Sequence, residues 1–256
     1  MLKNLIWNIL YALARALPHQ PRMTVLLYHS VSDSPDFFAV SPDIFDRQMR
    51  YVSERYAVVS LSRAFEHAAG KCVERDSVAV SFDDGYRDFL TEALPILERY
   101  QIPTTVFVLG DNPDRAELGT DHPLLAPEDF AKFSPLVTVG SHTLVHKKLI
   151  KMSVEDAVRE LSLSRESVKE RTGTVPRYLA YPKGSYNEVV MHLASEAGYD
   201  GAVSVVERGV HPGDSAYALP RVQIDSTTSF LRFQAKLTQA ADWYYRLWSL
   251  ARLKRK

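Results

Sequence analysis

Short apolar runs alternate with segments of helical periodicity through most of this chain. The apolar runs are rich in β-branched residues and too short for helices, so they predict buried strands. The segments between them repeat apolar residues at the spacing of an amphipathic helix. This alternation predicts an α/β fold with a parallel sheet. Strands are expected at 24–28, 56–61, 77–82, 104–109, 136–140, 178–181, 202–206 and 222–224, and helices at 42–54, 62–69, 87–100, 128–133, 153–171 and 188–197.

The strand predicted at 77–82 ends in two adjacent carboxylates, Asp83 and Asp84, which are followed by Gly85. Successive residues of an extended chain point to opposite sides, so one carboxylate can bind a metal while the other acts as a base. Parallel α/β folds place their chemistry at these carboxyl ends of strands. The alternative is an ordinary turn, because Asp-Gly is also common turn chemistry.

Two histidines four residues apart, His142 and His146, follow the strand predicted at 136–140. Asp84 and these histidines form a set of one carboxylate and two imidazoles. Three protein ligands that leave one position for water are typical of a catalytic metal site. The set predicts one divalent ion, with Zn²⁺ as the first choice and Co²⁺, Ni²⁺ or Fe²⁺ also suited to these ligands.

Both ends of the chain are amphipathic. Segment 2–17 repeats Leu and Ile at helical spacing and places Asn8 and Arg15 on the opposite face, and segment 243–256 mixes aromatic and basic residues. Such segments favour peripheral contact with a membrane, here a bacterial inner membrane on its cytoplasmic or periplasmic side. Two other readings stay open: both helices pack on the domain as covers, or segment 2–17 is a signal peptide, against which Asn8 and Arg15 argue.

Composition narrows the class of protein. Lys and Arg total 31 and Asp and Glu total 31 in 256 residues, so we expect no nucleic-acid partner. The length suits one barrel-sized domain, predicted at 23–228, between an N-terminal helix and linker at 1–22 and a basic, aromatic C-terminal helix at 229–256. The single cysteine, Cys72, excludes an internal disulfide. The sequence does not indicate an oligomeric state.

Several motifs resemble, in order, those of a known family. SFDDGY (81–86) and SHTLVH (141–146) resemble the first two motifs of the polysaccharide deacetylases, the NodB-homology carbohydrate esterases of family 4. The resemblance continues in VLLYHSV (25–31), FAVSPDIFDRQMRYV (38–52), AYPKGSYN (180–187) and LPRVQI (219–224). YHSV and LPR are most similar to the branch that acts on poly-N-acetylglucosamine and other exopolysaccharides. The resemblance implies a distorted (β/α)7-type barrel of mostly parallel strands and a metal-dependent hydrolase.

The resemblance also implies roles for site residues. Asp83 would be the general base, beside a metal on Asp84, His142 and His146. The acid of most family members is a late histidine in a Leu-x-His motif, which is missing after Leu219. In the exopolysaccharide branch an early Tyr-His fills this role, which transfers to His29.

The third motif departs from the family pattern. Its arginine, which orients the base, is Ala180 here, and we expect Arg221 to supply a guanidinium to Asp83 instead. The resemblance makes the backbone N–H of Lys183 an oxyanion donor. The Lys183 side chain would either contact an anionic substrate group or lie in solvent.

With this set of residues, the resemblance implies removal of N-acetyl groups from N-acetylhexosamine units of a polysaccharide, and the amphipathic termini add a lipid-linked glycan as a possible substrate. The same site would serve an O-acetyl esterase or a deformylase. A catalytically silent carbohydrate-binding protein is a third reading, favoured by Ala180 and opposed by the intact Asp83. We expect the polar segment 110–127 to be a substrate-binding loop. The remaining histidines are expected at the surface or in loops: His19, His67, His122, His192 and His211.

Overall fold

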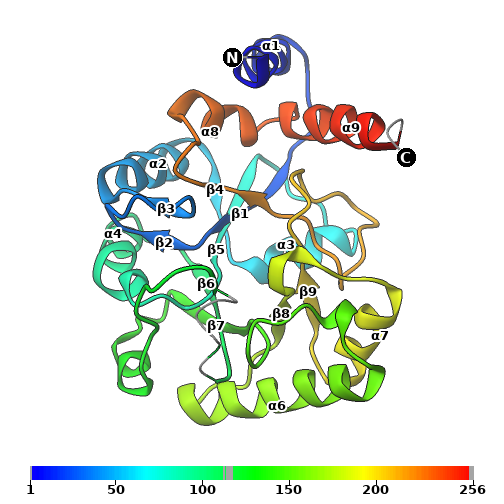
Figure 1. The fold of residues 1–256 in the computed structure, drawn as a ribbon. Helices are drawn as coiled ribbons and strands as arrows, with labels where there is room; N and C mark the ends of the chain where they lie inside the picture. Colours follow the sequence, from blue (N-terminus) through cyan, green and yellow to red (C-terminus); the bar gives the residue numbers. More distant parts are fainter. Residues whose placement is uncertain (1, 112, 114–117, 254–256) are drawn as a thin grey trace.

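The computed structural model describes residues 2–111, 113 and 118–253, and a parallel sheet curved into a barrel forms its centre (Figure 1). The strands pair in the order β10-β1-β5-β6-β7-β8-β9, and the short β4 pairs with β5 at the side of this path. All of these pairings are parallel, as the alternating pattern predicted. The strands are β1 (Met23–Tyr28), β4 (Ala57–Val58), β5 (Ser77–Phe82), β6 (Thr104–Val108), β7 (Val137–Ser141), β8 (Tyr178–Ala180), β9 (Gly201–Val203) and β10 (Val222–Gln223).

A short closing segment, 219–221, lies between the two edge strands of the sheet. Leu219 forms a parallel bridge with Val203 of β9, and the chain then enters β10, which pairs with β1. The Leu219 amide donates to Ala202, and the Ser204 amide donates to Leu219. The sheet is therefore consistent with a distorted (β/α)7 barrel, and the last residue of the closing segment, Arg221, is carried into the barrel interior, where its side chain is fully buried.

Helices surround the sheet on the outside of the barrel (Figure 1). The longest, α6, begins at Ser153, whose hydroxyl accepts from the Asp156 amide, and ends at Gly173 in the left-handed conformation. The apolar core lies between the sheet and helices such as α2, where Phe45, Met49 and Val52 are buried. The helices of the barrel are α2 (Pro42–Arg55), α3 (Leu61–Ala68), α4 (Leu94–Arg99), α6 (Val154–Thr172) and α7 (Glu188–Glu196).

Several elements differ from the sequence prediction. The helix predicted at 87–100 starts as a π-helical turn, η1 (Phe89–Ala93), and the one predicted at 128–133 is the 3₁₀ turn η2 (Pro127–Lys132). A two-stranded parallel pair, β2 (Ser30–Val31) and β3 (Ala39–Val40), was not predicted. Two-residue strands are too short to leave a periodic signal.

The C-terminal segment forms two helices where one was predicted. These are α8 (Phe230–Lys236) and α9 (Ala240–Leu253). Thr238 separates them, because its hydroxyl accepts from the Ala240 amide and its carbonyl accepts from Ala241. This local hydrogen bonding competes with a continuous helix.

Helix α1 (Leu2–Ala16) packs on α8 and α9, and the three helices form a layer at one side of the barrel (Figure 1). Trp7 is buried there and stacks on Tyr244 with ring centroids 4.4 Å apart. Within the described part of the chain, no helix is both long and apolar enough to cross a membrane.

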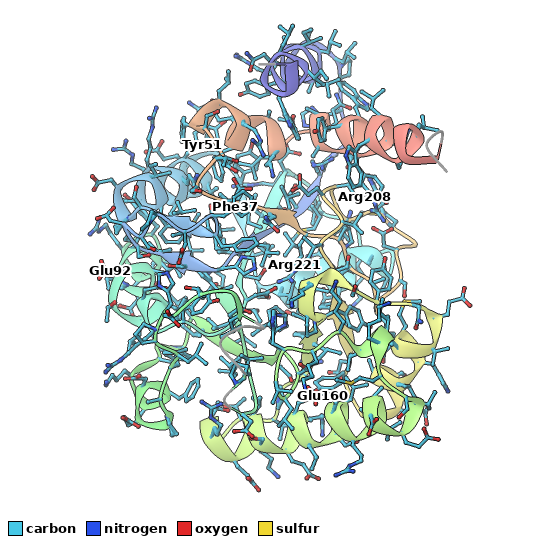
Figure 2. All side chains as sticks on the ribbon, in the orientation of Figure 1. Phe37, Tyr51, Glu92, Glu160, Arg208 and Arg221 are labelled. Carbon is cyan, nitrogen blue, oxygen red and sulfur yellow. The ribbon has the colours of Figure 1, made fainter. Side chains whose placement is uncertain are left out.

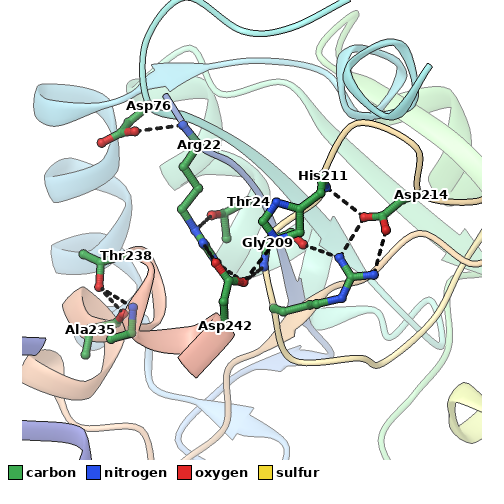
Figure 3. Close-up of polar contacts among 11 residues, drawn as sticks. Arg22, Thr24, Asp76, Gly209, His211, Asp214, Ala235, Thr238 and Asp242 are labelled. Carbon is green, nitrogen blue, oxygen red and sulfur yellow. Dashed lines mark hydrogen bonds and ion pairs between the residues drawn. The ribbon is translucent and has the colours of Figure 1, made fainter. Parts of the chain in front are cut away.

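A buried ion pair joins this layer to the barrel (Figure 3). Arg22, which precedes β1, donates from Nη2 to Asp242 of α9 at 3.1 Å, and Nη1 forms a second bond to the same carboxylate. The Gly209 amide donates to Asp242 at 2.9 Å. Although burial opposes ionisation, His211 and Arg22 hold the pKa of Asp242 well below its usual range. The carboxylate is therefore charged and paired, which fixes α9 against the barrel.

Candidate functional site

Asp83 and Asp84 lie directly after β5, as the sequence predicted, and both are buried. The Asp83 amide still donates to Tyr28 of the neighbouring β1, so the strand ladder holds its backbone. Asp84 and Gly85 are both left-handed, with φ of 69° and 68°. A Cβ on Gly85 would lie 3.0 Å from a Val108 methyl group, so glycine at this position lets the turn pack closely on β6.

The two predicted histidine ligands come from the end of β7 and the loop after it. Thr143 and His146 in this loop have φ of 68° and 62°, so the pair does not lie on a helix. Glu160 of α6 holds the loop from below: one carboxylate oxygen accepts from the amides of Leu144 and Val145, each at 3.0 Å. Glu160 was not singled out from the sequence, because its position in α6 is distant from every motif.

Asp84, His142 and His146 form the one group of potential metal ligands found among the described residues, with their ligand atoms within 4.8 Å of one another. The Nε2 atoms of His142 and His146 lie 3.3 and 3.5 Å from Oδ1 of Asp84. Ligand atoms about 2.1 Å from a tetrahedral metal lie roughly 3.4 Å apart. Oδ1 of Asp84 is buried and has no hydrogen-bond partner within the described part of the chain. The three atoms thus fit a divalent ion.

The tautomer of His142 is also suited to a metal. Its Nδ1 lies 2.8 Å from the backbone carbonyl of Ala180, to which it donates, so that Nε2 is left with a free lone pair toward Asp84. Metal-binding histidines are commonly oriented in this way by a backbone carbonyl. Ala180 therefore contacts the site through its backbone, although it lacks the family's arginine side chain.

Arg221 and Asp83 form a bidentate pair inside the barrel. The Nη1 and Nη2 atoms donate to Oδ1 and Oδ2 at 2.7 and 2.6 Å, and Nε donates to the Ser204 carbonyl at 3.0 Å. Burial alone would raise the pKa of Asp83, but the Arg221 guanidinium outweighs burial and holds the pKa below its ordinary value. The carboxylate is therefore ionised and fixed in orientation. Figure 2 shows Arg221 near the centre of the barrel and Glu160 on α6 beneath it.

His29 follows β1 and lines the same pocket as Asp83 and Asp84. Phe38 lies against its ring, with centroids 4.5 Å apart. Burial lowers the pKa of His29, although Asp84 and Asp83 oppose the shift. Its Nδ1 has no hydrogen-bond partner among the residues that the structure describes. The ring is thus placed by packing rather than by a hydrogen bond on Nδ1.

The pocket has a volume of about 260 Å³. Lys183 lies on its wall in the left-handed conformation, with φ of 57°, and its side chain is exposed. Leu118, from the segment 110–127, lines the pocket too. The full lining consists of His29, Phe38, Asp83, Asp84, Leu118, His142, His146, Lys183, Val205 and Gln223.

Two features of the site escaped the sequence analysis. Tyr86 is buried next to Asp84, and burial, together with the Asp84 charge, raises the pKa of Tyr86. His122 lies 2.6 Å from Asp36 and 3.5 Å from Asp88, and these contacts fix the segment that carries Leu118. Tyr86 lies within the SFDDGY motif but was given no role there, whereas His122 and its partners are distant in the chain and are brought together only by the fold.

The prediction for His67 was wrong. This residue of α3 is buried, and its Nδ1 accepts from the Val73 amide. The His67 ring therefore has a structural role in the packing of α3. Helix α3 turns this face toward the barrel, which a single polar residue in a short helix does not reveal.

The family model for polysaccharide deacetylases matches residues 70–202, which is half of the chain. YxkH of Bacillus subtilis (strain 168), a protein named for the same family, is 25% identical over 216 residues, which cover 84% of this chain and 75% of YxkH. The poly-β-1,6-N-acetyl-D-glucosamine N-deacetylase of Escherichia coli (strain K12) is 23% identical over 263 residues, which cover 86% of this chain and 39% of that relative.

Solved structures share the fold. The Streptococcus pyogenes deacetylase PplD, determined in complex with acetate, aligns with a TM-score of 0.73 at 22% identity. The alignment covers 86% of this chain and 99% of PplD.

Proposed function

Because the chain belongs to the polysaccharide deacetylase family, we propose that it removes N-acetyl groups from N-acetylhexosamine units of a glycan. One observation carries this proposal: an ionised carboxylate, Asp83, is clamped by Arg221 directly beside the convergent Asp84, His142 and His146. Amide hydrolysis needs a base next to an activated water, and this arrangement provides both positions.

Asp84, His142 and His146 would hold the metal, with Zn²⁺ as the first candidate. When bound, a divalent ion supplies an electrophile for the acetyl carbonyl and lowers the pKa of water to about 7. Asp83 then accepts a proton from the attacking water. Arg221 keeps Asp83 ionised and prevents its rotation, because both carboxylate oxygens are bound.

The leaving amine needs a proton, and His29 is the proposed donor. It lines the pocket on the β1 side, and Phe38 restricts its ring. The backbone N–H of Lys183 is the proposed oxyanion donor, and its side chain, exposed on the pocket wall, is the proposed contact for an anionic substituent of the substrate.

The substrate class rests on the relatives. The E. coli relative is named as a deacetylase of poly-β-1,6-N-acetyl-D-glucosamine, and the chain spans 39% of its length. We therefore propose an N-acetylglucosamine polymer as the substrate. A lipid-linked N-acetylhexosamine is the second candidate, favoured by the amphipathic termini.

The test measures acetate release from N-acetylglucosamine oligomers and from a lipid-linked N-acetylhexosamine. Each assay is run with a chelator and then with Zn²⁺ or Co²⁺ added back. Asp83→Asn is the inactive control, and Glu155→Gln, an exposed change on α6, is the matched active control. Metal-dependent acetate release that Asp83→Asn abolishes supports the proposal.

Failure of this assay has distinct meanings. Release of formate, or of acetate from O-acetyl substrates only, would overturn the de-N-acetylase in favour of the esterase or deformylase. Saturable glycan binding without any release by metal-loaded protein would favour the carbohydrate-binding reading.

A further inference from the structure

The apolar stripe of α1 faces away from the protein. The stripe consists of Leu5, Ile9 and Leu13, which follow one another at intervals of four residues and are 56%, 52% and 48% exposed. Leu17, just after the helix, continues the stripe and is 50% exposed. Ala12 and Ala16 are exposed with them. An amphipathic helix in a water-soluble domain normally turns such a stripe toward the core. Here the stripe has no cover within the described structure.

Contact with α8 and α9 uses a different side of the same helix. Trp7, Leu10 and Ala14 are buried against Ala240 and Ala241. These three residues lie at about 140–200° on the helical wheel if Leu5 is placed at 0°, whereas Ile9 and Leu13 lie at about 40–80°. The helix is thus fixed to the protein by one half of its apolar surface, and the other half faces outward. Packing on α8 and α9 does not account for the stripe.

The ends of the chain carry charge of one sign. Residues 1–21 and 243–256 contain seven Lys and Arg and no Asp or Glu, whereas the rest of the chain has 24 Lys and Arg against 31 Asp and Glu. Arg15 is exposed on α1, and Arg246 is exposed on α9 beside the exposed Leu247. Helices that lie in the interface of an anionic bilayer combine exposed apolar residues with basic residues, and they are often rich in Trp and Tyr. Both ends of this chain have that composition.

We propose that the outer face of α1, defined as Leu5, Ile9, Leu13 and Leu17, lies in the headgroup region of an anionic phospholipid membrane, with α9 beside it. In this proposal the helix lies in the plane of the membrane, with its outer face toward the lipid and Trp7, Leu10 and Ala14 toward the protein. This binding is independent of the proposed deacetylase activity.

A second copy of the chain is the alternative cover. A symmetric dimer through α1 would bring two basic end segments together and would set like charges against each other. The charge pattern therefore favours lipid. Moreover, none of the residues that line the pocket come from α1, α8 or α9, so membrane binding leaves the pocket open to a glycan.

The experiment measures binding of the full chain to vesicles by flotation, without glycan substrate. One set of vesicles is pure phosphatidylcholine and the other contains phosphatidylglycerol. The test variant is Ile9→Gln/Leu13→Gln. The matched control is Val158→Gln/Leu163→Gln, which changes two similarly exposed side chains, 42% and 43%, on α6 at the far end of the molecule (Figure 1). A second test variant, Leu5→Gln/Leu17→Gln, replaces the first if that one has a lowered Tm.

We expect the unaltered chain to bind phosphatidylglycerol vesicles more tightly than phosphatidylcholine vesicles, and added salt to weaken this binding. The test variant should partition at least about tenfold more weakly, because two apolar side chains lose their burial in the interface, and the control should change less than about twofold. Absence of vesicle binding, or equal loss in the control, would overturn the proposal. A dimer in light scattering that Ile9→Gln/Leu13→Gln dissociates, without vesicle binding, would assign the face to a second copy.

Discussion

Arg221 binds both carboxylate oxygens of Asp83 from a segment 138 positions later in the chain. The family pattern places an arginine at the position of Ala180, and this chain brings a guanidinium to the same base from the closing segment of the barrel. The carbonyl of Ala180 meanwhile binds His142. Arg221 thus orients Asp83, the proposed base, while the Ala180 carbonyl orients His142, a proposed metal ligand.

Replacing Arg221 should shift the acidic limb of the pH profile. Arg221→Met leaves Asp83 buried without its principal cation, and burial raises a carboxyl pKa, so the protonated, inactive form should persist to higher pH. We expect kcat/KM at neutral pH to fall by about 10²-fold or more, with the acidic limb moved upward. Arg221→Lys should not restore activity fully, because an ammonium cannot form the bidentate pair. An unchanged acidic limb in Arg221→Met would contradict the role of the pair.

Replacing Asp83 and replacing Asp84 should have different effects on activity and on metal content. Asp83→Asn should lower kcat by about 10²- to 10⁴-fold while bound metal, measured by elemental analysis after dialysis, stays near that of the unaltered protein. Asp84→Asn should lose both, because it weakens one of three ligands. If Asp83→Asn loses the metal and Asp84→Asn retains it, then Asp83 is the ligand and Asp84 is the base, contrary to the proposal.

Deprotonation of His29 should determine the alkaline limb of the pH profile of kcat/KM. An acid works only while protonated, and burial lowers the pKa of His29 below its ordinary 6.5, so its protonated fraction falls as pH rises through that lowered value. We expect kcat/KM to decline over this range in the unaltered enzyme. His29→Gln should have lower activity and should lack this limb, measured as kcat/KM from pH 5 to 9 with the metal saturating. A variant that keeps the same limb would exclude His29 as the acid.

Glu160 should act on metal affinity without touching the metal. Glu160→Ala removes the acceptor for the Leu144 and Val145 amides, so the left-handed loop that carries His146 loses its support. We expect metal to bind about 10- to 100-fold more weakly in competition with a chromogenic chelator. Glu160→Gln should be close to normal, because its amide oxygen still accepts, and Glu155→Ala on the same helix is the control. Equal affinity in Glu160→Ala and the control would refute the supporting role.

The sequence predicted the features that depend on local pattern or on ligand chemistry. The strands that flank the site were predictable because continuous apolar runs mark strands buried on both faces. Asp84, His142 and His146 could be grouped because so few residue types bind metals. The left-handed backbone at His146 and the contact between Glu160 and the loop were not predictable, since both depend on packing between segments distant in the chain.

The same limit applies to surfaces. Periodicity identified the apolar stripe of α1, but it could not tell which side of the helix would meet the protein. Trp7 contributes to this orientation, because its ring stacks on Tyr244 of α9, at the other end of the chain. Likewise, Thr238 separates α8 from α9 because its hydroxyl accepts from the Ala240 amide. Helical periodicity does not predict such a local hydrogen bond.

The closing segment links catalysis to local unfolding. Two backbone hydrogen bonds of Leu219 tie it to β9, and the Arg221 guanidinium rests on Ser204 just beyond. If the closing segment opens locally before the whole domain unfolds, the guanidinium is withdrawn from Asp83, the proposed base. Mild denaturant should then inactivate the enzyme before the helices unfold. An inhibitor bound in the pocket should protect the closing segment against this local opening, because it binds only the closed form.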